Sequence, residues 1–300
     1  MAGERVYKLK KPVRYPFLDF SSLAAREANC RQEVRLNRRL APDIYLGVVP
    51  LTRSADGALS LDGHGEVVDW LVLMRRLPGE RMFDCMLRQG LVGDTELDQL
   101  TTVLASFYRG AEPGGISPAA YADRFSRQQT INREVLTRRD FALDHGRAAT
   151  VLDRLDQALA DGAELLQERV RAGRIVDGHG DLRPEHICLT EPVVIFDCLE
   201  FNRELRLVDP FDETAFLGME CALLGARWVA PRLVEDFAAK LGERPPAPLM
   251  ALYTAFRAVM RARLALAHLL DATPREPGKW EPLATRYLDL AEQALSSAGP

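Results

Sequence analysis

Hydrophobic and polar positions alternate in two different ways over the first forty residues. Arg5 to Leu9 alternates with a period of two, which predicts a strand. Ser21 or Ser22 can cap a helix that continues to Leu40, because both are good N-cap residues. Ala41-Pro42 then ends the helix, since proline cannot continue it. The chain therefore begins with a strand followed by a helix.

Two further apolar runs follow this helix. Ile44 to Leu51 and Val67 to Leu73 are rich in β-branched residues and predict two strands. The stretch between them is rich in glycine and aspartate, which suits hairpin turns. Residues 1–77 are thus expected to form a small lobe of strands and one helix. Leu73 to Leu77, at the end of this lobe, is the expected hinge.

The pattern becomes helical after residue 78. Thr95 and Asp98 form a capping box before an amphipathic run to Arg109, and Ser117-Pro118 opens another helix. One island interrupts the helices, where Ile187 to Leu189 and Val193 to Phe196 predict a small hairpin. Helices are expected to resume near residue 210.

These patterns predict an α+β chain of two lobes, a small one over residues 1–77 and a large, mainly helical one over residues 78–300. The hydrophobic fraction of 47% and the charged fraction of 27% are those of a folded, water-soluble protein. No run of about 18 apolar residues is present, so no membrane partner is expected. Oligomeric state cannot be deduced from these patterns.

Charge and cysteine content narrow the classes of function. A net charge of −4 gives no overall attraction to nucleic acid, although the segment from Arg5 to Arg39 is basic and keeps such binding as a third hypothesis. The five cysteines are scattered and include no CxxC pair, which argues against a disulfide framework and a zinc ribbon. Reduced cysteines and a charged N-terminus without a signal peptide predict a cytoplasmic location.

The densest polar cluster lies between Val176 and Asn202. Charged and imidazole side chains alternate there with apolar strand segments, among them His179, Asp181, Arg183, Glu185, His186, Asp197 and Glu200. Buried charges are costly unless they are paired, so such a cluster is poor core material and good site material.

The cluster carries a resemblance to a known family. The run from His179 to His186, HGDLRPEH, is similar to the catalytic loop of protein-kinase-like enzymes, and Ile195-Phe196-Asp197 resembles their metal-binding aspartate. The HGD form resembles the aminoglycoside phosphotransferase and choline kinase group of small-molecule kinases, in an uncharacterised bacterial branch. The resemblance extends over nearly the whole chain and implies the two-lobe protein-kinase-like fold.

The resemblance implies a phosphotransferase that uses ATP and Mg²⁺. Asp181 would accept the proton of the acceptor hydroxyl, and Asp197 would hold Mg²⁺ through its carboxylate oxygens. Arg183 could meet the transferring phosphoryl group as a cation. The acceptor is expected to be a small hydroxylated or aminated metabolite, and its identity cannot be deduced from the sequence.

Nucleotide-binding residues are expected in the first lobe. Lys8 and Lys10 project from one face of a strand, and either could reach the phosphates, with the V-x-K spacing favouring Lys8. Glu33 shares a helix face with Leu36, Asn37 and Leu40, so it is the expected partner of the lysine. Glu27 is the alternative to Glu33, and Met74 is the expected backbone contact for adenine at the hinge.

The same resemblance implies structural roles for a histidine and an aspartate in the second half of the chain. His179 would hydrogen-bond backbone around the catalytic loop rather than transfer a proton. Asp212 would brace that loop from the start of a helix, with Asp209 as its rival for the role.

Two departures from the family pattern bear on activity. His186 stands where an asparagine would bind the second metal, so it could bind metal less well, contact a phosphate or be a buried histidine. Only seven residues precede Lys8, too few for the strands of a Gly-rich phosphate loop. Either the start lies further upstream or the phosphates are held less tightly. The alternative to an active kinase is an inactive nucleotide-binding or regulatory module.

Overall fold

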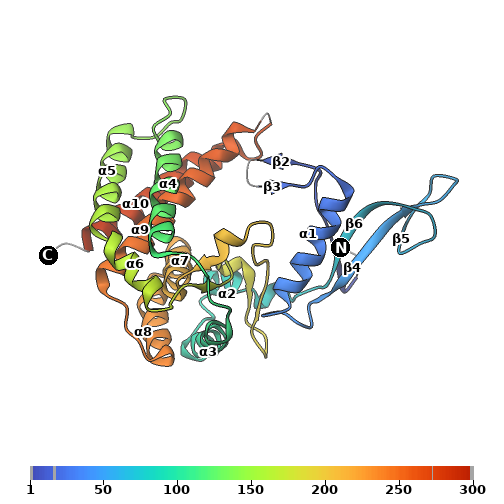
Figure 1. Ribbon diagram of the computed structural model, residues 1–300, viewed down its shortest axis with the longest axis horizontal. Coiled ribbons are helices and arrows are strands. Elements are labelled where there is room, and N and C mark those ends of the chain that lie inside the picture. The colour runs from blue at the N-terminus through green and yellow to red at the C-terminus, as the bar shows by residue number, and fades with distance from the viewer. Residues whose placement is uncertain (1–2, 16–17, 272, 298–300) are drawn as a thin grey trace. The chain divides into compact units, whose positions relative to one another are not determined.

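The computed structural model describes residues 3–15, 18–271 and 273–297 and contains both strands and helices (Figure 1). The strands are β1 (Arg5–Leu9), β2 (Arg14–Tyr15), β3 (Leu18–Asp19), β4 (Tyr45–Arg53), β5 (Leu59–Leu61), β6 (Glu66–Arg75), β7 (Val176–Asp177), β8 (Ile187–Cys188), β9 (Val194–Ile195) and β10 (Leu207–Val208). The helices are α1 (Leu23–Asn37), α2 (Phe83–Arg88), α3 (Asp94–Gly110), α4 (Pro118–Leu136), α5 (His145–Asp161), α6 (Ala163–Arg171), α7 (Pro210–Leu223), α8 (Val229–Leu241), α9 (Ala247–Ala267) and α10 (Trp280–Ser297). The expected α+β class is confirmed.

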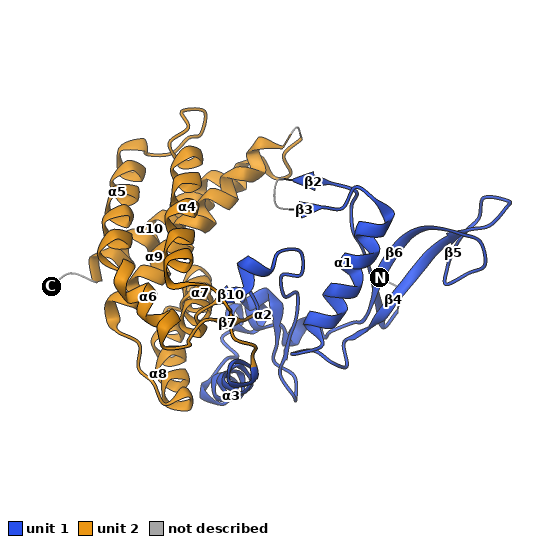
Figure 2. Ribbon diagram, in the orientation of Figure 1, with its two compact units in different colours: residues 1–110, 179–207 blue, residues 111–178, 208–300 orange. Residues whose placement is uncertain are grey.

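The chain divides into two compact units (Figure 2). Unit 1 comprises residues 1–110 and 179–207, and unit 2 comprises residues 111–178 and 208–300. The predicted catalytic loop and metal segment thus belong to the same unit as the N-terminal strands. The lobe division predicted after residue 77 stays a prediction.

Unit 1 is built on an antiparallel sheet of four strands in the order β1-β6-β4-β5. β6 pairs with β1 on one side, with Lys8 opposite Val72, and with β4 on the other. The three strands predicted from the sequence are confirmed. β5 was not predicted; it lies in the Gly- and Asp-rich stretch and pairs with the end of β4.

Helix α1 packs against this sheet through an apolar cluster. Ser22 caps the helix by accepting a hydrogen bond from the Ala25 amide. The cluster joins Cys30 and Val34 of α1 to residues of β4 and β6 such as Val72, all buried. The helix ends at Asn37 rather than at the predicted Leu40, because the chain leaves α1 in tighter turns that lead to β4. α1 is therefore fixed to the sheet whose strand β1 carries Lys8.

The predicted hairpin before residue 201 is also confirmed. β8 and β9 pair antiparallel, with Ile187 opposite Ile195. This pairing places the end of the loop that begins at His179 beside the start of the segment that carries Asp197.

Unit 2 is helical, and α7 lies almost completely buried within it. Asp209 caps α7 by accepting a hydrogen bond from the Phe211 amide, and it also forms an ion pair with Arg169. Asp212 forms an ion pair with Arg257 at 2.6 Å. These contacts lie within unit 2, and the brace on the catalytic loop predicted for Asp212 or Asp209 stays a prediction.

No helix in the described part of the chain is both long enough and apolar enough to cross a membrane.

Candidate functional site

His179 connects the loop that carries Asp181 to the segment before Asp197. Its ring is fully buried, with Nε2 2.9 Å from the carbonyl oxygen of Phe196 and Nδ1 3.3 Å from the amide nitrogen of Asp181. Because the amide donates to Nδ1, the neutral ring carries its proton on Nε2 and donates it to the carbonyl. The predicted structural role of His179 is confirmed.

The ionisation of His179 predicts an acid-sensitive stability. Burial lowers the pKa of His179 to about 4. The unfolded chain therefore binds the proton first as the pH falls, so the stabilisation is complete above pH 6.5 and is lost towards pH 4. We expect it to amount to roughly 3 kcal/mol of unfolding free energy between pH 7 and pH 4. Urea unfolding at both values measures it, and equal pH dependence in His179→Asn would contradict this assignment.

The backbone at position 180 explains why the middle residue of the HGD motif is glycine. Gly180 has a φ of +90°, in the region that favours glycine. A Cβ atom there would lie 3.0 Å from Leu199 Cδ1 and 3.1 Å from the carbonyl oxygen of Leu205. A larger residue would therefore be strained and crowded at the position next to Asp181.

The Asp181 carboxylate is partly exposed and has cationic or polar neighbours. The side chain is 25% exposed, and Oδ2 lies 3.7 Å from Arg183 Nη1 and 3.6 Å from His186 Nδ1. Arg183 also forms an ion pair with Glu185, and its buried Nε has no hydrogen-bond partner among the described residues. Asp181 can thus reach a ligand from the solvent side, while Arg183 keeps one donor unused.

His186 lies between the two candidate aspartates. Its Nδ1 is 2.8 Å from the carbonyl oxygen of Asp181, and its Nε2 is 3.6 Å from Asp197 Oδ2. In the neutral ring, Nδ1 carries the proton because a carbonyl can only accept, so the lone pair of Nε2 faces Asp197. A nitrogen donor and a carboxylate oxygen therefore converge on one place.

Asp197 has an unusual backbone that three contacts hold in place. Its φ is +61°, which is rare for a residue other than glycine. The amide of Asp197 donates a hydrogen bond to the Tyr45 hydroxyl at 3.2 Å. The amide of Cys198, the next residue, donates to Asn37 Oδ1 at 2.8 Å. The amide of Phe196, the residue before, donates to the His186 carbonyl oxygen at 2.9 Å. Unusual backbone of this kind persists where surrounding contacts determine it.

Lys8 reaches both Glu33 and Asp197. Its Nζ is 2.9 Å from Glu33 Oε1 and 2.5 Å from Asp197 Oδ1. Burial lowers the pKa of Lys8, but the two carboxylates outweigh burial and the net change is upward. Burial raises the pKa of Asp197, and the charge of Lys8 outweighs it, so that pKa lies below its ordinary value. Both groups are therefore ionised at neutral pH.

Glu33, and not Glu27, is the carboxylate that the lysines contact. Glu33 is fully buried and accepts from Lys8 and from Lys10, whose Nζ lies 2.5 Å from Glu33 Oε2. Glu27 forms an ion pair with Arg31 on the surface of α1. The structure thus brings Lys8, Lys10 and Glu33 together, while their roles toward a nucleotide stay predictions.

Three contributors to the site were given no role from the sequence, although Glu200 belongs to the polar cluster between Val176 and Asn202. Glu200 binds Lys10 at 2.6 Å, and burial raises its pKa although Lys10 opposes this. Asn37 and Tyr45 hold the segment around Asp197 through its backbone. The spacing of Asn37 from Glu33 on one helix face was a signal for Asn37, whereas nothing in the sequence marks Tyr45.

Met74 lies within β6, opposite both Val6 of β1 and Tyr45 of β4. Its side chain is part of the apolar cluster under α1. A contact between its backbone and adenine stays a prediction.

Comparisons with known proteins identify both relatives and a fold. Three uncharacterised mycobacterial proteins, two from strains of Mycobacterium tuberculosis and one from Mycobacterium bovis, are each 33% identical to this chain over 302 residues. The match covers 99% of this chain but 58% of each relative, so the chain spans a little over half of their length. No family model matches the chain.

Solved structures of small-molecule kinases are similar in fold. A choline kinase from Cryptosporidium parvum has a TM-score of 0.58 at 10% identity, and the match covers 98% of this chain and 83% of that kinase. The chain has the choline kinase fold. An ethanolamine kinase from Plasmodium vivax has a TM-score of 0.55 at 9% identity, and the match covers 99% of this chain and 76% of that kinase. A choline kinase from Streptococcus pneumoniae has a TM-score of 0.52 at 12% identity, and the match covers 89% of this chain and 80% of that kinase. The predicted fold is confirmed.

The donor set of this choline kinase fold fits a divalent cation completed by ligand oxygens. Within the described residues, no group of three or more histidine, cysteine, aspartate or glutamate side chains forms a closed metal cage. Asp197 and His186 provide one carboxylate and one imidazole nitrogen. Magnesium commonly uses one or two carboxylates and takes its other ligands from phosphates and water. The residues therefore fit a metal that arrives with a nucleotide.

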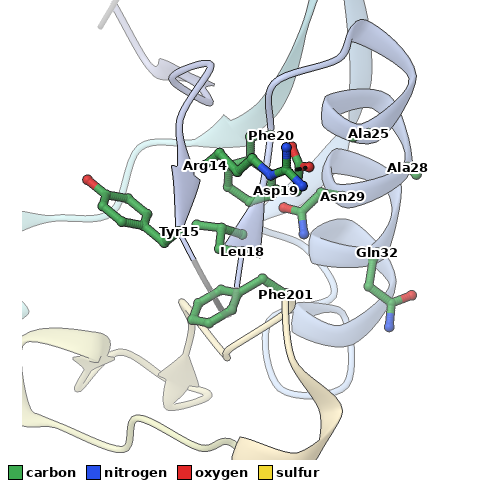
Figure 3. A pocket seen from close by; sticks show the side chains of 10 residues that line it. All are labelled: Arg14, Tyr15, Leu18, Asp19, Phe20, Ala25, Ala28, Asn29, Gln32 and Phe201. Carbon is green, nitrogen blue, oxygen red and sulfur yellow. Dashed lines mark ion pairs between the residues drawn. The ribbon is translucent and has the colours of Figure 1, made fainter.

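A hollow also lies beside α1 (Figure 3). It measures about 580 Å³ and lies between the β2–β3 strands and α1, with Phe201 at one end. Its lining consists of Arg14, Tyr15, Leu18, Asp19, Phe20, Ala25, Ala28, Asn29, Gln32 and Phe201. Asp181, Arg183, His186 and Asp197 are not among these residues.

Proposed function

We propose that this chain is an ATP-dependent phosphotransferase that acts on a small hydroxylated or aminated metabolite. The observation that carries the proposal is the convergence of two aspartates, one imidazole and one lysine within unit 1. His186 contacts both Asp181 and Asp197 at 3.6 Å, and Lys8 contacts Asp197. Phosphoryl transfer needs this combination of a proton acceptor, a metal ligand and a cation for the phosphates.

Each residue has a role that follows from its surroundings. Asp181 is partly exposed and would accept the proton of the attacking hydroxyl. Asp197 would hold Mg²⁺, with His186 Nε2 beside it, and Lys8 would move from Asp197 to the nucleotide phosphates. Arg183 would donate its unused Nε–H to the transferring group. Mg²⁺, when bound, supplies positive charge that stabilises the phosphoryl group during transfer.

The acceptor class can be tested with labelled ATP. The chain is incubated with Mg²⁺, γ-labelled ATP and pools of small hydroxylated or aminated metabolites, and the small-molecule fraction is analysed for label. Label in a metabolite supports the proposal. ATP that binds but keeps its label with every pool would instead identify the inactive nucleotide-binding module, and absence of ATP binding would refute both.

Replacing Lys8 should weaken nucleotide binding. We expect Lys8→Met to lower ATP affinity by roughly 10-fold or more, because one charge-assisted contact to a phosphate is lost. Calorimetric titration of ATP measures the change, and Lys11→Met is the control because Lys11 is exposed. Unchanged affinity in Lys8→Met would show that this lysine does not contact the nucleotide.

A further inference from the structure

The two lysines of the site have very different surroundings. The Lys8 side chain is 39% exposed, whereas that of Lys10 is 4% exposed. Lys10 Nζ lies between the fully buried Glu33 and the largely buried Glu200, 2.5 Å from Glu33 Oε2 and 2.6 Å from Glu200 Oε1. Glu33 therefore uses one oxygen for each lysine. Only Lys8 is placed to exchange a partner without breaking a buried ion pair.

Lys10 is closed off on its remaining side by an aromatic ring. Its Nζ lies 5.2 Å from the centroid of Phe20, which also lines the hollow beside α1. Contact of an ammonium group with an aromatic face is favourable, and burial of that charge is tolerated because it is paired. A phosphate could reach Lys10 only by displacing one of its carboxylates, which would leave a buried charge without a partner.

Lys10 also connects three separate parts of unit 1. It follows β1 directly, Glu33 belongs to α1, and Glu200 lies three residues after Asp197. When Lys8 leaves Asp197 for a nucleotide, Lys10 remains to neutralise Glu33 and to hold Glu200. Without Lys10, two buried carboxylates would compete with the nucleotide for Lys8.

We propose that Lys10 is a positioning residue that holds Glu33 and Glu200 in place, so that Lys8 is free to transfer from Asp197 to the nucleotide. This inference rests on the proposed function and assigns different tasks to the two lysines that the sequence left as alternatives. Lys8 binds the phosphates, and Lys10 with Glu200 fixes the frame in which Lys8 moves.

The experiment compares Lys10→Met, Lys8→Met, Glu200→Gln and the double variant Lys10→Met/Glu200→Gln, with Lys11→Met as the exposed control. ATP affinity, kcat per folded molecule and the urea midpoint are measured for each. We expect Lys10→Met to lower kcat by roughly 10- to 100-fold and to weaken ATP binding by less than Lys8→Met does, because Lys8 is then drawn towards the unpaired carboxylates but is still present. We expect the double variant to recover several-fold in kcat and in urea midpoint, because the unpaired Glu200 charge is removed with its partner.

Each other outcome is decisive. If Lys10→Met weakens ATP binding as much as Lys8→Met, Lys10 is itself a phosphate ligand and the inference is wrong. If kcat per folded molecule is unchanged, or if Glu200→Gln restores nothing, Lys10 has a structural role only. A wild-type chain without ATP turnover would refute the proposed function and this inference with it, whereas an active wild type with either of the earlier results refutes the inference alone.

Discussion

Asp181→Asn should lower the rate of phosphoryl transfer by roughly 10²- to 10⁴-fold, the range expected when a general base is removed. The amide keeps the size of the carboxylate and can still accept from its neighbours, but it cannot take a proton from the acceptor. ATP affinity should stay near that of the wild type, because Asp181 is not among the groups that we assign to the nucleotide. Initial rates at saturating ATP measure the effect.

The control for this prediction is Asp43→Asn, since Asp43 is exposed in the turn after α1. Unfolding by urea should be similar for both variants, because the Asp181 side chain is 25% exposed and its ion pair with Arg183 is long, at 3.7 Å. A turnover equal to that of the wild type would remove Asp181 from the chemistry. A large loss of ATP affinity would give it a binding role instead.

Asp197→Asn should have a second large effect, with a different signature. An amide carries no negative charge for Mg²⁺ or for Lys8, so we expect turnover to fall by roughly 10²- to 10³-fold. The variant should also need a higher Mg²⁺ concentration to reach half of its own maximal rate. Rates across a Mg²⁺ titration measure both quantities.

The backbone around Asp197 makes asparagine the right replacement. Asparagine tolerates the left-handed conformation better than most residues, so the φ of +61° can be kept and the loss can be attributed to charge. The amide of residue 197 can still donate to the Tyr45 hydroxyl. A variant with the Mg²⁺ dependence of the wild type would contradict the assignment of Asp197 as the metal ligand.

Much of the fold could be predicted because local signals agreed with it. The alternation in β1, the Ser22 cap of α1 and the β-branched runs of β4 and β6 all act within a few residues, and each was confirmed. The hairpin of β8 and β9 was predicted in the same way. β5 was missed because a three-residue strand in a Gly-rich stretch forms through hydrogen bonds to its partner strand and has no hydrophobic pattern of its own.

The composition of the site depended more on long-range contacts. Lys8 and Glu33 could be paired from strand and helix periodicity, since both lie on faces that must be directed inward. Lys10, Glu200 and Tyr45 take their places from residues far along the chain, such as the 190 positions that separate Lys10 from Glu200. No local pattern reports such contacts, so the second lysine could not be assigned from the sequence.

The polar face of α1 shows the same limit. Arg26, Glu33 and Asn37 are buried at helical spacing, where an amphipathic pattern would place apolar residues. Each has a partner: Arg26 pairs with Asp69, Glu33 with the lysines and Asn37 with the Cys198 amide. A helix face that buries paired polar side chains therefore has a weak hydrophobic pattern.

The most direct measurement is a calorimetric titration of ATP into the wild-type chain and into Asp197→Asn, each with and without Mg²⁺. If Asp197 and the phosphates share one divalent cation, Mg²⁺ will tighten ATP binding to the wild type and will have little effect on the variant. Wild-type affinity that does not change with Mg²⁺, or equal tightening in both proteins, would contradict the account.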